Sequence, residues 1–267
     1  MSLSIDLSGR KALVTGVTRG IGAGIAQKLA EAGCDVAGCG LADAEDECVF
    51  CFIEDIERAG RRVHYATVDL SLPEAPAQWV ADAAAALGGI DILVSNAGRN
   101  YFEGAANTSQ ATWQTSLDLN LAAHWRLAQA AYPFLKQSNN QPVIIIITSN
   151  HAYYTIPGSF PYNVSKAGLV AMVQSLAIEW GPQIRTVGIA PGFINTPANE
   201  QWFDTFPNPA AERARTEQLH PVGRLGTVEE IGALCAFLAT PWSGFISGTT
   251  ILVDGGRSAL MQDKSND

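Results

Sequence analysis

Short runs of aliphatic and β-branched residues alternate with longer stretches of helical spacing along almost the whole chain. This alternation is typical of βαβ units. Each run is apolar on both faces, which suits the strands of a parallel sheet that is covered by helices on both sides. The expected strands are 12–15, 36–39, 63–68, 92–95, 143–148, 186–189 and 250–253, and the expected helices are 21–32, 44–59, 74–87, 110–136, 161–180 and 227–239. The pattern therefore predicts an α/β fold with a doubly wound, seven-stranded parallel sheet.

One domain is expected to account for residues 1–267. The chain is 47% hydrophobic, enough for one substantial core, and no linker, repeat or low-complexity tract interrupts the alternation. Residues 195–224 differ, because they lack a strand pattern and contain four prolines. Connections of this length in compact enzymes are usually lids or binding loops, so we expect a substrate loop with short helices there.

Charge and cysteine content limit the classes of partner. The formal net charge is −9, which argues against a nucleic-acid binder or a protein that binds anionic membranes. Residues 1–10 contain no apolar signal segment, and the longest aliphatic run, Val143–Ile147, is far too short to span a membrane. Five scattered cysteines fit a reducing compartment. These features predict a cytoplasmic protein with a small-molecule substrate.

No metal site is expected. The four histidines are dispersed, and the pair Cys48 and Cys51 has no second pair to complete a zinc site. We expect these two cysteines to be buried apolar residues within a helix.

A glycine-rich loop, Thr15-Gly16-Val17-Thr18-Arg19-Gly20-Ile21-Gly22, follows the first expected strand and precedes a helix. Glycines at such a place let the main chain turn sharply and approach a pyrophosphate, whose charge is met by the amides at the helix N-terminus. A loop of this kind is weak support by itself, but its position between strand and helix favours a Rossmann dinucleotide-binding domain.

The spacing G-x-x-x-G-x-G, Asp69 after the third strand, Ser95-Asn96-Ala97-Gly98 after the fourth and Tyr162-x-x-x-Lys166 together resemble the short-chain dehydrogenase/reductase family. The resemblance covers nearly the whole chain and implies an NAD(P) cofactor. Ser95 departs from the asparagine that is commoner in the family. The resemblance implies that the cofactor is bound by Gly16, Thr18, Arg19, Gly20, Ile21, Gly22, Asp69, Leu70, Asn96, Ala97, Gly98, Tyr162, Lys166, Pro191, Gly192, Ile194 and Thr196.

The choice between NAD and NADP stays open at this level. NAD-specific relatives usually end the second strand with an acidic residue, whereas Gly40 stands here. Arg19 resembles the basic residue that holds the 2′-phosphate in NADP-dependent relatives. The acidic run 43–47 would repel a phosphate if it folded over the ribose, although its position also suits the N-terminus of the next helix.

Tyr162 and Lys166 are four residues apart, so on a helix both lie on one face. A nearby cation favours the phenolate of a tyrosine, whose ordinary pKa is about 10. In the family, the tyrosine exchanges a proton with the substrate, the lysine lowers its pKa and holds the nicotinamide ribose, a serine orients the substrate, and a helix asparagine completes a proton relay. By resemblance the last two are Ser149 and Asn120. These four are the expected catalytic residues, and the reaction is hydride transfer.

The candidate substrate residues mix hydrogen-bond donors with aromatic rings, namely Arg99, Asn100, His151, Tyr153, Phe193, Trp202 and Phe206. Steroid and fatty-acyl pockets are ordinarily more uniformly apolar. We therefore expect a sugar or sugar derivative that is oxidised at a secondary or anomeric hydroxyl, with a lactone as product in the anomeric case. Arg99 would pair with an anionic sugar, or would lie exposed at the pocket rim.

Two alternatives remain at this level. A 3-ketoacyl-thioester reductase would share every catalytic motif, and a dinucleotide-binding regulator without catalysis would share the glycine loop. The intact Ser149, Tyr162 and Lys166 set argues against the regulator. The family resemblance also implies a homotetramer.

Overall fold

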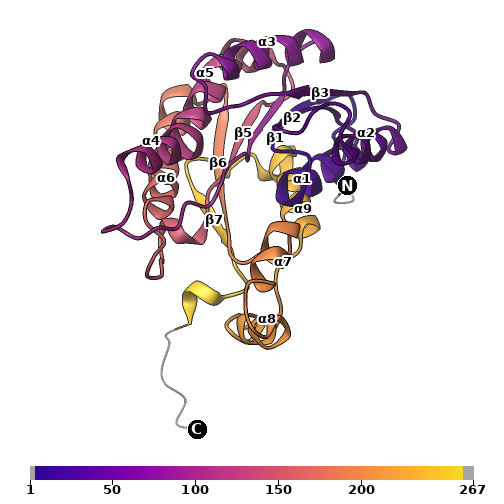
Figure 1. The fold of residues 1–267 in the computed structure, drawn as a ribbon. Coiled ribbons are helices and arrows are strands. Elements are labelled where there is room, and N and C mark those ends of the chain that lie inside the picture. Colours follow the sequence, from indigo (N-terminus) through magenta and orange to yellow (C-terminus); the bar gives the residue numbers. More distant parts are fainter. Residues whose placement is uncertain (1–3, 261–267) are drawn as a thin grey trace.

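The computed structural model describes residues 4–260, and its centre is one seven-stranded parallel sheet with the order β3-β2-β1-β4-β5-β6-β7. All seven predicted strands form, and the fold class and the doubly wound arrangement are confirmed (Figure 1). The strands are β1 Lys11–Thr15, β2 Asp35–Gly40, β3 Val63–Thr67, β4 Ile92–Ser95, β5 Val143–Ile147, β6 Arg185–Pro191 and β7 Thr250–Val253.

Successive residues of each strand point to opposite faces of the sheet and enter two separate cores. Val14 and Ile145 belong to one core, whereas their neighbours Leu13 and Ile144 belong to the other. All four side chains are fully buried. Because both faces must be covered, every strand of the centre reads as a continuous apolar run rather than as an alternating one.

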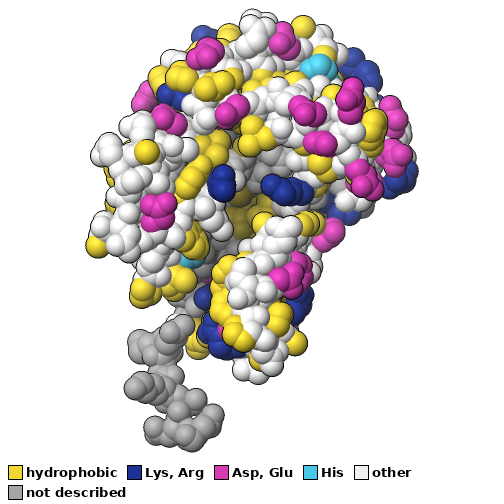
Figure 2. All heavy atoms as spheres, in the orientation of Figure 1, with side chains coloured by type: hydrophobic (Ala, Val, Ile, Leu, Met, Phe, Trp, Pro, Cys, Tyr) yellow, Lys and Arg dark blue, Asp and Glu magenta, His cyan; other side chains and the backbone are white. Residues whose placement is uncertain are grey.

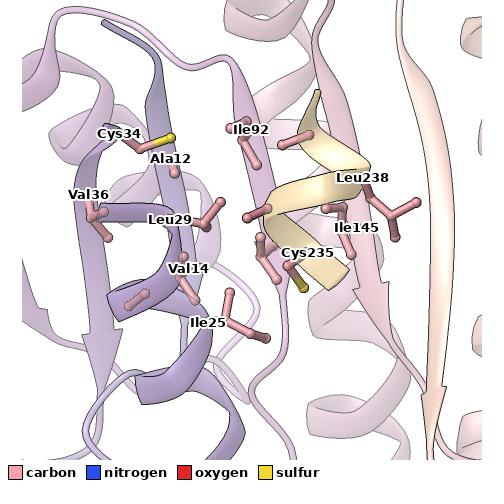
Figure 3. Close-up of a cluster of buried hydrophobic side chains, with 14 of the residues drawn as sticks. Ala12, Val14, Ile25, Leu29, Cys34, Val36, Ile92, Ile145, Cys235 and Leu238 are labelled. Atoms are coloured by element: carbon pink, nitrogen blue, oxygen red, sulfur yellow. The ribbon is translucent and has the colours of Figure 1, made fainter. Parts of the chain in front are cut away.

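The first face is covered by α1 Gly20–Glu31, α2 Glu47–Arg58 and α9 Val228–Ala239. Figure 3 shows Ile25 and Leu29 of α1 beside Cys235 and Leu238 of α9, all within one apolar cluster against the strands. The predicted capping box of Thr227 and Glu230 begins α9.

The second face is covered by α3 Ala75–Leu87, α5 Ala123–Gln137 and α6 Tyr162–Trp180. Trp79 of α3, Leu127 of α5 and Leu169 of α6 are buried in the second core. The helices predicted over 74–87 and 161–180 are therefore confirmed, and each buries apolar side chains against the sheet.

The prediction of one continuous helix over 110–136 is wrong. A π-helical turn at Asp118–Ala122 separates α4 Gln110–Leu117 from α5. Its central residue, Asn120, is fully buried and hydrogen-bonded to a neighbouring loop, and the wider turn accommodates this side chain. Apolar spacing hardly changes across one such turn, so the sequence pattern did not reveal it.

Residues 195–224 contain two short helices, α7 Pro197–Phe203 and α8 Pro209–Gln218, which confirms the prediction of short helices in this segment. Proline occupies the beginning of both, where its missing amide hydrogen costs nothing, and Thr196 and Asn208 cap them. Figure 1 shows the pair protruding beyond the sheet edge at which β6 ends.

Two further findings concern the surface. Cys51 is exposed and Cys48 is half-buried, so the prediction that both are buried is wrong; the helix turns this side toward solvent at its first turns.

Within residues 4–260, no helix is both long and apolar enough to cross a membrane, and no group of three or more His, Cys, Asp or Glu side chains is arranged to hold a metal ion.

Candidate active site

The glycine loop joins β1 to α1 and leaves the N-terminus of that helix without a protein partner. Arg19 is the N-cap residue but makes no side-chain cap hydrogen bond, and the first turn of α1 contains no acidic residue. The N-termini of α4, α7, α8 and α9 are capped by side chains, whereas α1, like α2, α3 and α6, has no side-chain cap. The free amides and the helix dipole of α1 can therefore receive an external anion.

Gly22 shows how tightly this loop is closed. A Cβ atom at Gly22 would lie 2.0 Å from the carbonyl oxygen of Gly16 and 2.6 Å from Nδ2 of Asn96. The helix N-terminus, the end of β1 and the turn after β4 therefore meet at a point that admits no side chain.

The Asn96-Ala97-Gly98 turn is tied to β1 by Thr15. Oγ1 of Thr15 accepts hydrogen bonds from the amides of Asn96 and Ala97, both at 2.9 Å, and Nδ2 of Asn96 donates to the Thr15 carbonyl at 2.8 Å. Thr15 was not among the predicted site residues, although it precedes the first glycine of the loop.

Asn120 holds the main chain that follows this turn. Its Oδ1 accepts from the Arg99 amide at 2.9 Å, and its Nδ2 donates to the Arg99 carbonyl at 2.8 Å. Ser116, also buried and also missed in the sequence, lies 3.4 Å from Nδ2. The asparagine is thus committed to shaping the loop beside Gly98.

Lys166 also borders Gly98, because its Nζ would lie 3.5 Å from a Cβ atom at that position. The Nζ donates to the Ile147 carbonyl at the end of β5, at 3.1 Å. The side chain is buried, and burial lowers the pKa of Lys166 to about 8. Its Nζ is 5.7 Å from the centre of the Tyr162 ring.

Tyr162 opens α6 and meets Ser149, the residue that follows β5 by two positions. Burial raises the pKa of Tyr162, and its hydrogen bond with Ser149 acts in the opposite direction. Oγ of Ser149 also accepts from the His151 amide at 3.2 Å. In the chain alone, burial thus dominates the pKa of Tyr162, and the lowering by Lys166 stays a prediction for the complex with a cofactor.

Ser95 and His124 form a second buried polar pair near Lys166. Oγ of Ser95 and Nδ1 of His124 are 2.8 Å apart, and both side chains are buried. Burial, followed by the charge of Lys166, lowers the pKa of His124 to about 3, so this imidazole is neutral. Ser95, which departs from the commoner asparagine, therefore has a partner one helical turn beyond Asn120 that the sequence interpretation missed.

The predicted adenosine residues lie around the same loop. Arg19 is exposed, Thr18 is half-buried beside Gly40 at the end of β2, and Leu70 is buried. Asp69 is exposed, and its Oδ1 accepts from the amide and hydroxyl of Ser71. In the acidic run, Asp46 is the N-cap residue of α2 and Glu47 lies in the first turn, as the helix interpretation predicts.

The segment after β6 borders the glycine loop on the side away from the Asn96-Ala97-Gly98 turn. Pro191 ends β6, Gly192 packs against Asp254, and Ile194 is buried and pairs with Gly226. Thr196 lies against Gly20 of the glycine loop, 3.5 Å from where a Cβ atom would be. Segments almost the whole length of the chain apart thus converge at the predicted cofactor position.

Aromatic side chains form the walls on the substrate side. The ring centres of Phe102 and His151 lie 5.3 and 6.0 Å from that of Tyr162, each nearly edge-on. Trp202 contacts both Phe193 and Phe206, with ring centres 5.6 and 4.7 Å apart. Phe102 was not predicted, because nothing in the local sequence shows that its loop folds over α6.

The three remaining predicted substrate residues lie on the surface. Arg99, Asn100 and Tyr153 are all exposed. The Arg99 guanidinium lies 5.7 Å from the centre of the Tyr101 ring, and the Arg99 main chain is bound by Asn120.

The molecule is visibly hollowed between its main body and the α7–α8 segment, with basic side chains at the border of the hollow (Figure 2). A cavity of about 130 Å³ lies at the base of this segment, lined among others by Phe193, Val222 and Asp254. Phe193 is thus shared by this cavity and the aromatic cluster around Trp202.

Comparisons with known proteins agree with this arrangement. A family model described as Enoyl-(Acyl carrier protein) reductase matches residues 16–258. The chain is 33% identical over 252 residues to 3beta-hydroxysteroid dehydrogenase 1 of Eggerthella lenta, with 94% of both chains covered. It is 32% identical over 260 residues to 2-dehydro-3-deoxy-D-gluconate 5-dehydrogenase of Dickeya dadantii, with 95% of this chain and 97% of that protein covered.

A solved structure shows the same fold. The short-chain dehydrogenase/reductase from Serratia marcescens BCRC 10948 superimposes with a TM-score of 0.86 at 31% identity, over 94% of this chain and 99% of that one. These similarities extend over the glycine loop, the catalytic residues and the C-terminal strand alike.

Proposed function

Because this chain belongs to the short-chain dehydrogenase/reductase family, we propose that it is an NAD(P)-dependent oxidoreductase that interconverts a hydroxyl and a carbonyl group on a sugar or sugar derivative. The observation that carries the proposal is the convergence of Ser149, Tyr162 and Lys166 beside the uncapped N-terminus of α1.

The residues present fit a nicotinamide dinucleotide. The free amides of α1 suit its diphosphate, and the close approach at Gly22 leaves the main chain accessible where a side chain would block it. Lys166 and the Asn96-Ala97-Gly98 turn would hold the nicotinamide ribose. When bound, the nicotinamide ring supplies the hydride chemistry.

The chain itself supplies positioning and proton transfer. The Tyr162 hydroxyl exchanges a proton with the substrate oxygen, and Ser149, already hydrogen-bonded to Tyr162, orients that oxygen. The buried Lys166 ammonium favours the phenolate of Tyr162 in the loaded enzyme, and Asn120 fixes the loop that borders Lys166.

A sugar substrate is supported by two observations. The Phe102 ring packs against polar His151, and Phe193 packs against Trp202 in the segment after β6; polar and aromatic side chains in combination suit a polyhydroxylated ring. One relative carries the name of a dehydrogenase that acts on a sugar acid, 2-dehydro-3-deoxy-D-gluconate. We also propose that residues 195–224 act as a lid and that the enzyme is a homotetramer.

Reduction of a 3-ketoacyl thioester is the second candidate. The matching family model is described by an acyl-carrier-protein reductase, and another relative is named for a steroid. Exposed apolar side chains near the cleft, such as Phe102 and Trp202, would suit such a substrate. The net charge of −9 disfavours docking of an acidic carrier protein.

A substrate panel tests the proposal. Aldoses, sugar acids, a steroid alcohol and a 3-ketoacyl thioester are each assayed with NAD(H) and NADP(H) by the near-ultraviolet absorbance of the reduced nicotinamide. We expect turnover of sugars, and we expect Tyr162→Phe to lose at least about a thousandfold in kcat while cofactor affinity changes by less than about threefold, because the phenyl ring keeps the packing and loses only the proton.

Thr112→Val is a suitable control, because its hydroxyl bonds Ser109, the N-cap residue of α4, and Glu103, and neither of these has an assigned role in the site. Turnover by Tyr162→Phe at the wild-type rate would contradict the catalytic role. Activity on the thioester or steroid alone would replace the sugar proposal, and cofactor binding without any turnover would support a regulator.

A further inference from the structure

Arg257 lies at the same edge of the sheet as the catalytic residues, although 91 residues of chain separate it from Lys166. It begins a short 3-10 turn, Arg257–Ala259, that follows β7. Strands β5, β6 and β7 are neighbours and parallel, so the segments that follow them emerge side by side. Ser149 and His151 follow β5, Phe193 follows β6, and Arg257 follows β7.

Asp254 holds the turn that carries Arg257. Its carboxylate accepts hydrogen bonds from main-chain amides and forms no ion pair with Arg257 within residues 4–260. Oδ1 of Asp254 accepts from the Gly256 amide at 3.0 Å, and Oδ2 accepts from the Ser258 amide at 2.8 Å. The Arg257 side chain is only half-buried, and within residues 4–260 it forms no hydrogen bond or ion pair. A rigid turn thus presents a guanidinium whose donors have no partner in this part of the chain.

The strand register brings the segments after β5 and β7 to the same level of the sheet. Ile147 of β5 pairs with Ile189 of β6, and Pro191, two residues further on, pairs with Val253 of β7, so Ser149 and Val253 lie at corresponding positions two strands apart. In agreement with this position, burial and then the Arg257 charge lower the pKa of His151, whose ring is 6.0 Å from that of Tyr162. Arg257 therefore lies on the part of the sheet edge that carries His151.

Arg215 does not compete for the same role, because Glu212 already binds it through two hydrogen bonds. Arg99, which the sequence suggested for binding an anion, is exposed and stacked over Tyr101. Arg257 is thus the better placed of the candidate arginines for an anion in the cleft.

We propose that Arg257 is a specificity-determining residue that binds a carboxylate of the substrate, with His151 as its polar neighbour between that carboxylate and the reacting carbon. The planar guanidinium can pair with both oxygens of a carboxylate, and such pairing offsets the desolvation of a half-buried cation. The inference rests on the proposed oxidoreductase function and narrows its substrate to an acid with a hydroxyl or carbonyl group some distance from the carboxylate.

Matched pairs of acid and neutral compound test it. The cofactor-loaded enzyme is titrated with D-glucuronate and D-glucose, with D-galacturonate and D-galactose, and with 3-hydroxybutyrate and its amide, by calorimetry and by turnover. We expect the wild type to bind at least one acid about ten- to a hundredfold more tightly than its neutral partner, the range of a charge-assisted hydrogen bond.

The variants are Arg257→Gln, Arg257→Lys and the control Arg58→Gln, which removes an exposed arginine from α2. Arg257→Gln should abolish the preference for the acid and leave affinity for the neutral partner unchanged within about twofold. Arg257→Lys should retain part of the preference, because it keeps the charge without the planar fork. Arg58→Gln should behave as wild type.

A wild type without preference for any of the three acids overturns the proposal, and so does an unchanged preference in Arg257→Gln. Should Arg257→Gln fail to fold, a full wild-type preference in Arg257→Lys overturns the bidentate contact. Turnover of neutral sugars with no preference for acids would contradict the carboxylate site and leave the oxidoreductase function intact. Tight binding of an acid without turnover would support the carboxylate site and contradict the oxidoreductase function.

Discussion

Two regions meet at the carboxyl edge of the sheet, and they are built in different ways. The cofactor region, formed by segments after β1 and β4, is shaped by main chain: a Cβ atom at Gly22 would clash with the Gly16 carbonyl, and Thr15 binds the amides of Asn96 and Ala97. The proposed substrate region, formed by segments after β5, β6 and β7, is lined by side chains such as His151, Phe193 and Trp202.

The difference follows from what each region recognises. A diphosphate is the same in every nicotinamide cofactor, so amides at fixed positions suffice to bind it. A substrate differs from enzyme to enzyme, so its recognition rests on side chains that can change without disturbing the sheet. Substitutions should therefore damage the two regions in distinct ways.

The largest effect is expected from Gly22→Ala. The new Cβ atom would lie 2.0 Å from a main-chain oxygen, so the loop must open. We expect the Kd for NAD(P) to rise by about a hundredfold or more, which corresponds to about 3 kcal/mol or more. Calorimetric titration with each cofactor and thermal unfolding measure the two consequences.

Gly158→Ala is the matched control in the substrate region. Gly158 differs from Gly22 in having a positive φ, of 86°, and a Cβ atom there would meet nothing within 4 Å. Only the backbone strain of about 1–2 kcal/mol remains, so cofactor affinity should stay unchanged. Equal loss of cofactor affinity in both variants would show that the two regions are not separable.

The next effect concerns Lys166, which borders both regions. Its pKa is lowered by burial from 10.5 to about 8, so between these values the unfolded chain binds more protons than the folded one. Stability should therefore rise with pH in this window, because the cost of burying the ammonium disappears as it loses its proton. Lys166→Met carries no such cost.

We expect Lys166→Met, without cofactor, to be more stable than wild type at about pH 7, by on the order of 2–3 kcal/mol, and to lose this advantage by about pH 10. Urea unfolding at several pH values measures the difference, and activity should be lost at all of them. An advantage that stays constant with pH would contradict the pKa of about 8 assigned to Lys166.

The sequence predicted the cofactor region better than the substrate region, for a physical reason. Glycine spacing, apolar strands and the four-residue separation of Tyr162 and Lys166 are local patterns, and local geometry alone fixes what they do. The seven strands and the α9 capping box could be predicted for the same reason.

Features that depend on distant parts of the chain could not be predicted. The π-helical turn exists because Asn120 binds the main chain of Arg99, 21 residues away. His124 pairs with Ser95 across two elements, and Arg257 approaches His151 only because β5, β6 and β7 are neighbours. The position of the Arg99 guanidinium over the Tyr101 ring likewise depends on how this loop folds.

The smallest effect is expected from Glu230→Gln in α9, the helix that packs against α1 beneath the cofactor region. The Glu230 carboxylate binds both terminal nitrogens of Arg224 and accepts from the Thr227 amide at 2.9 Å. These hydrogen bonds lower its pKa to about 2. Because the side chain is 44% exposed, the loss of stability at about pH 7 should be only about 1 kcal/mol.

A lowered carboxylate pKa contributes stability above the unfolded value of 4.5 and loses that contribution as the pH falls toward about 2. The difference between wild type and Glu230→Gln in urea unfolding should therefore vanish at acidic pH. Cofactor affinity should change by less than about twofold, because Glu230 is bonded to Arg224 and Thr227, whereas α9 packs on α1 through Val228 and Gly232. A tenfold loss of cofactor affinity would mean that the α1 terminus depends on distant packing, and that main-chain geometry alone does not shape the cofactor region.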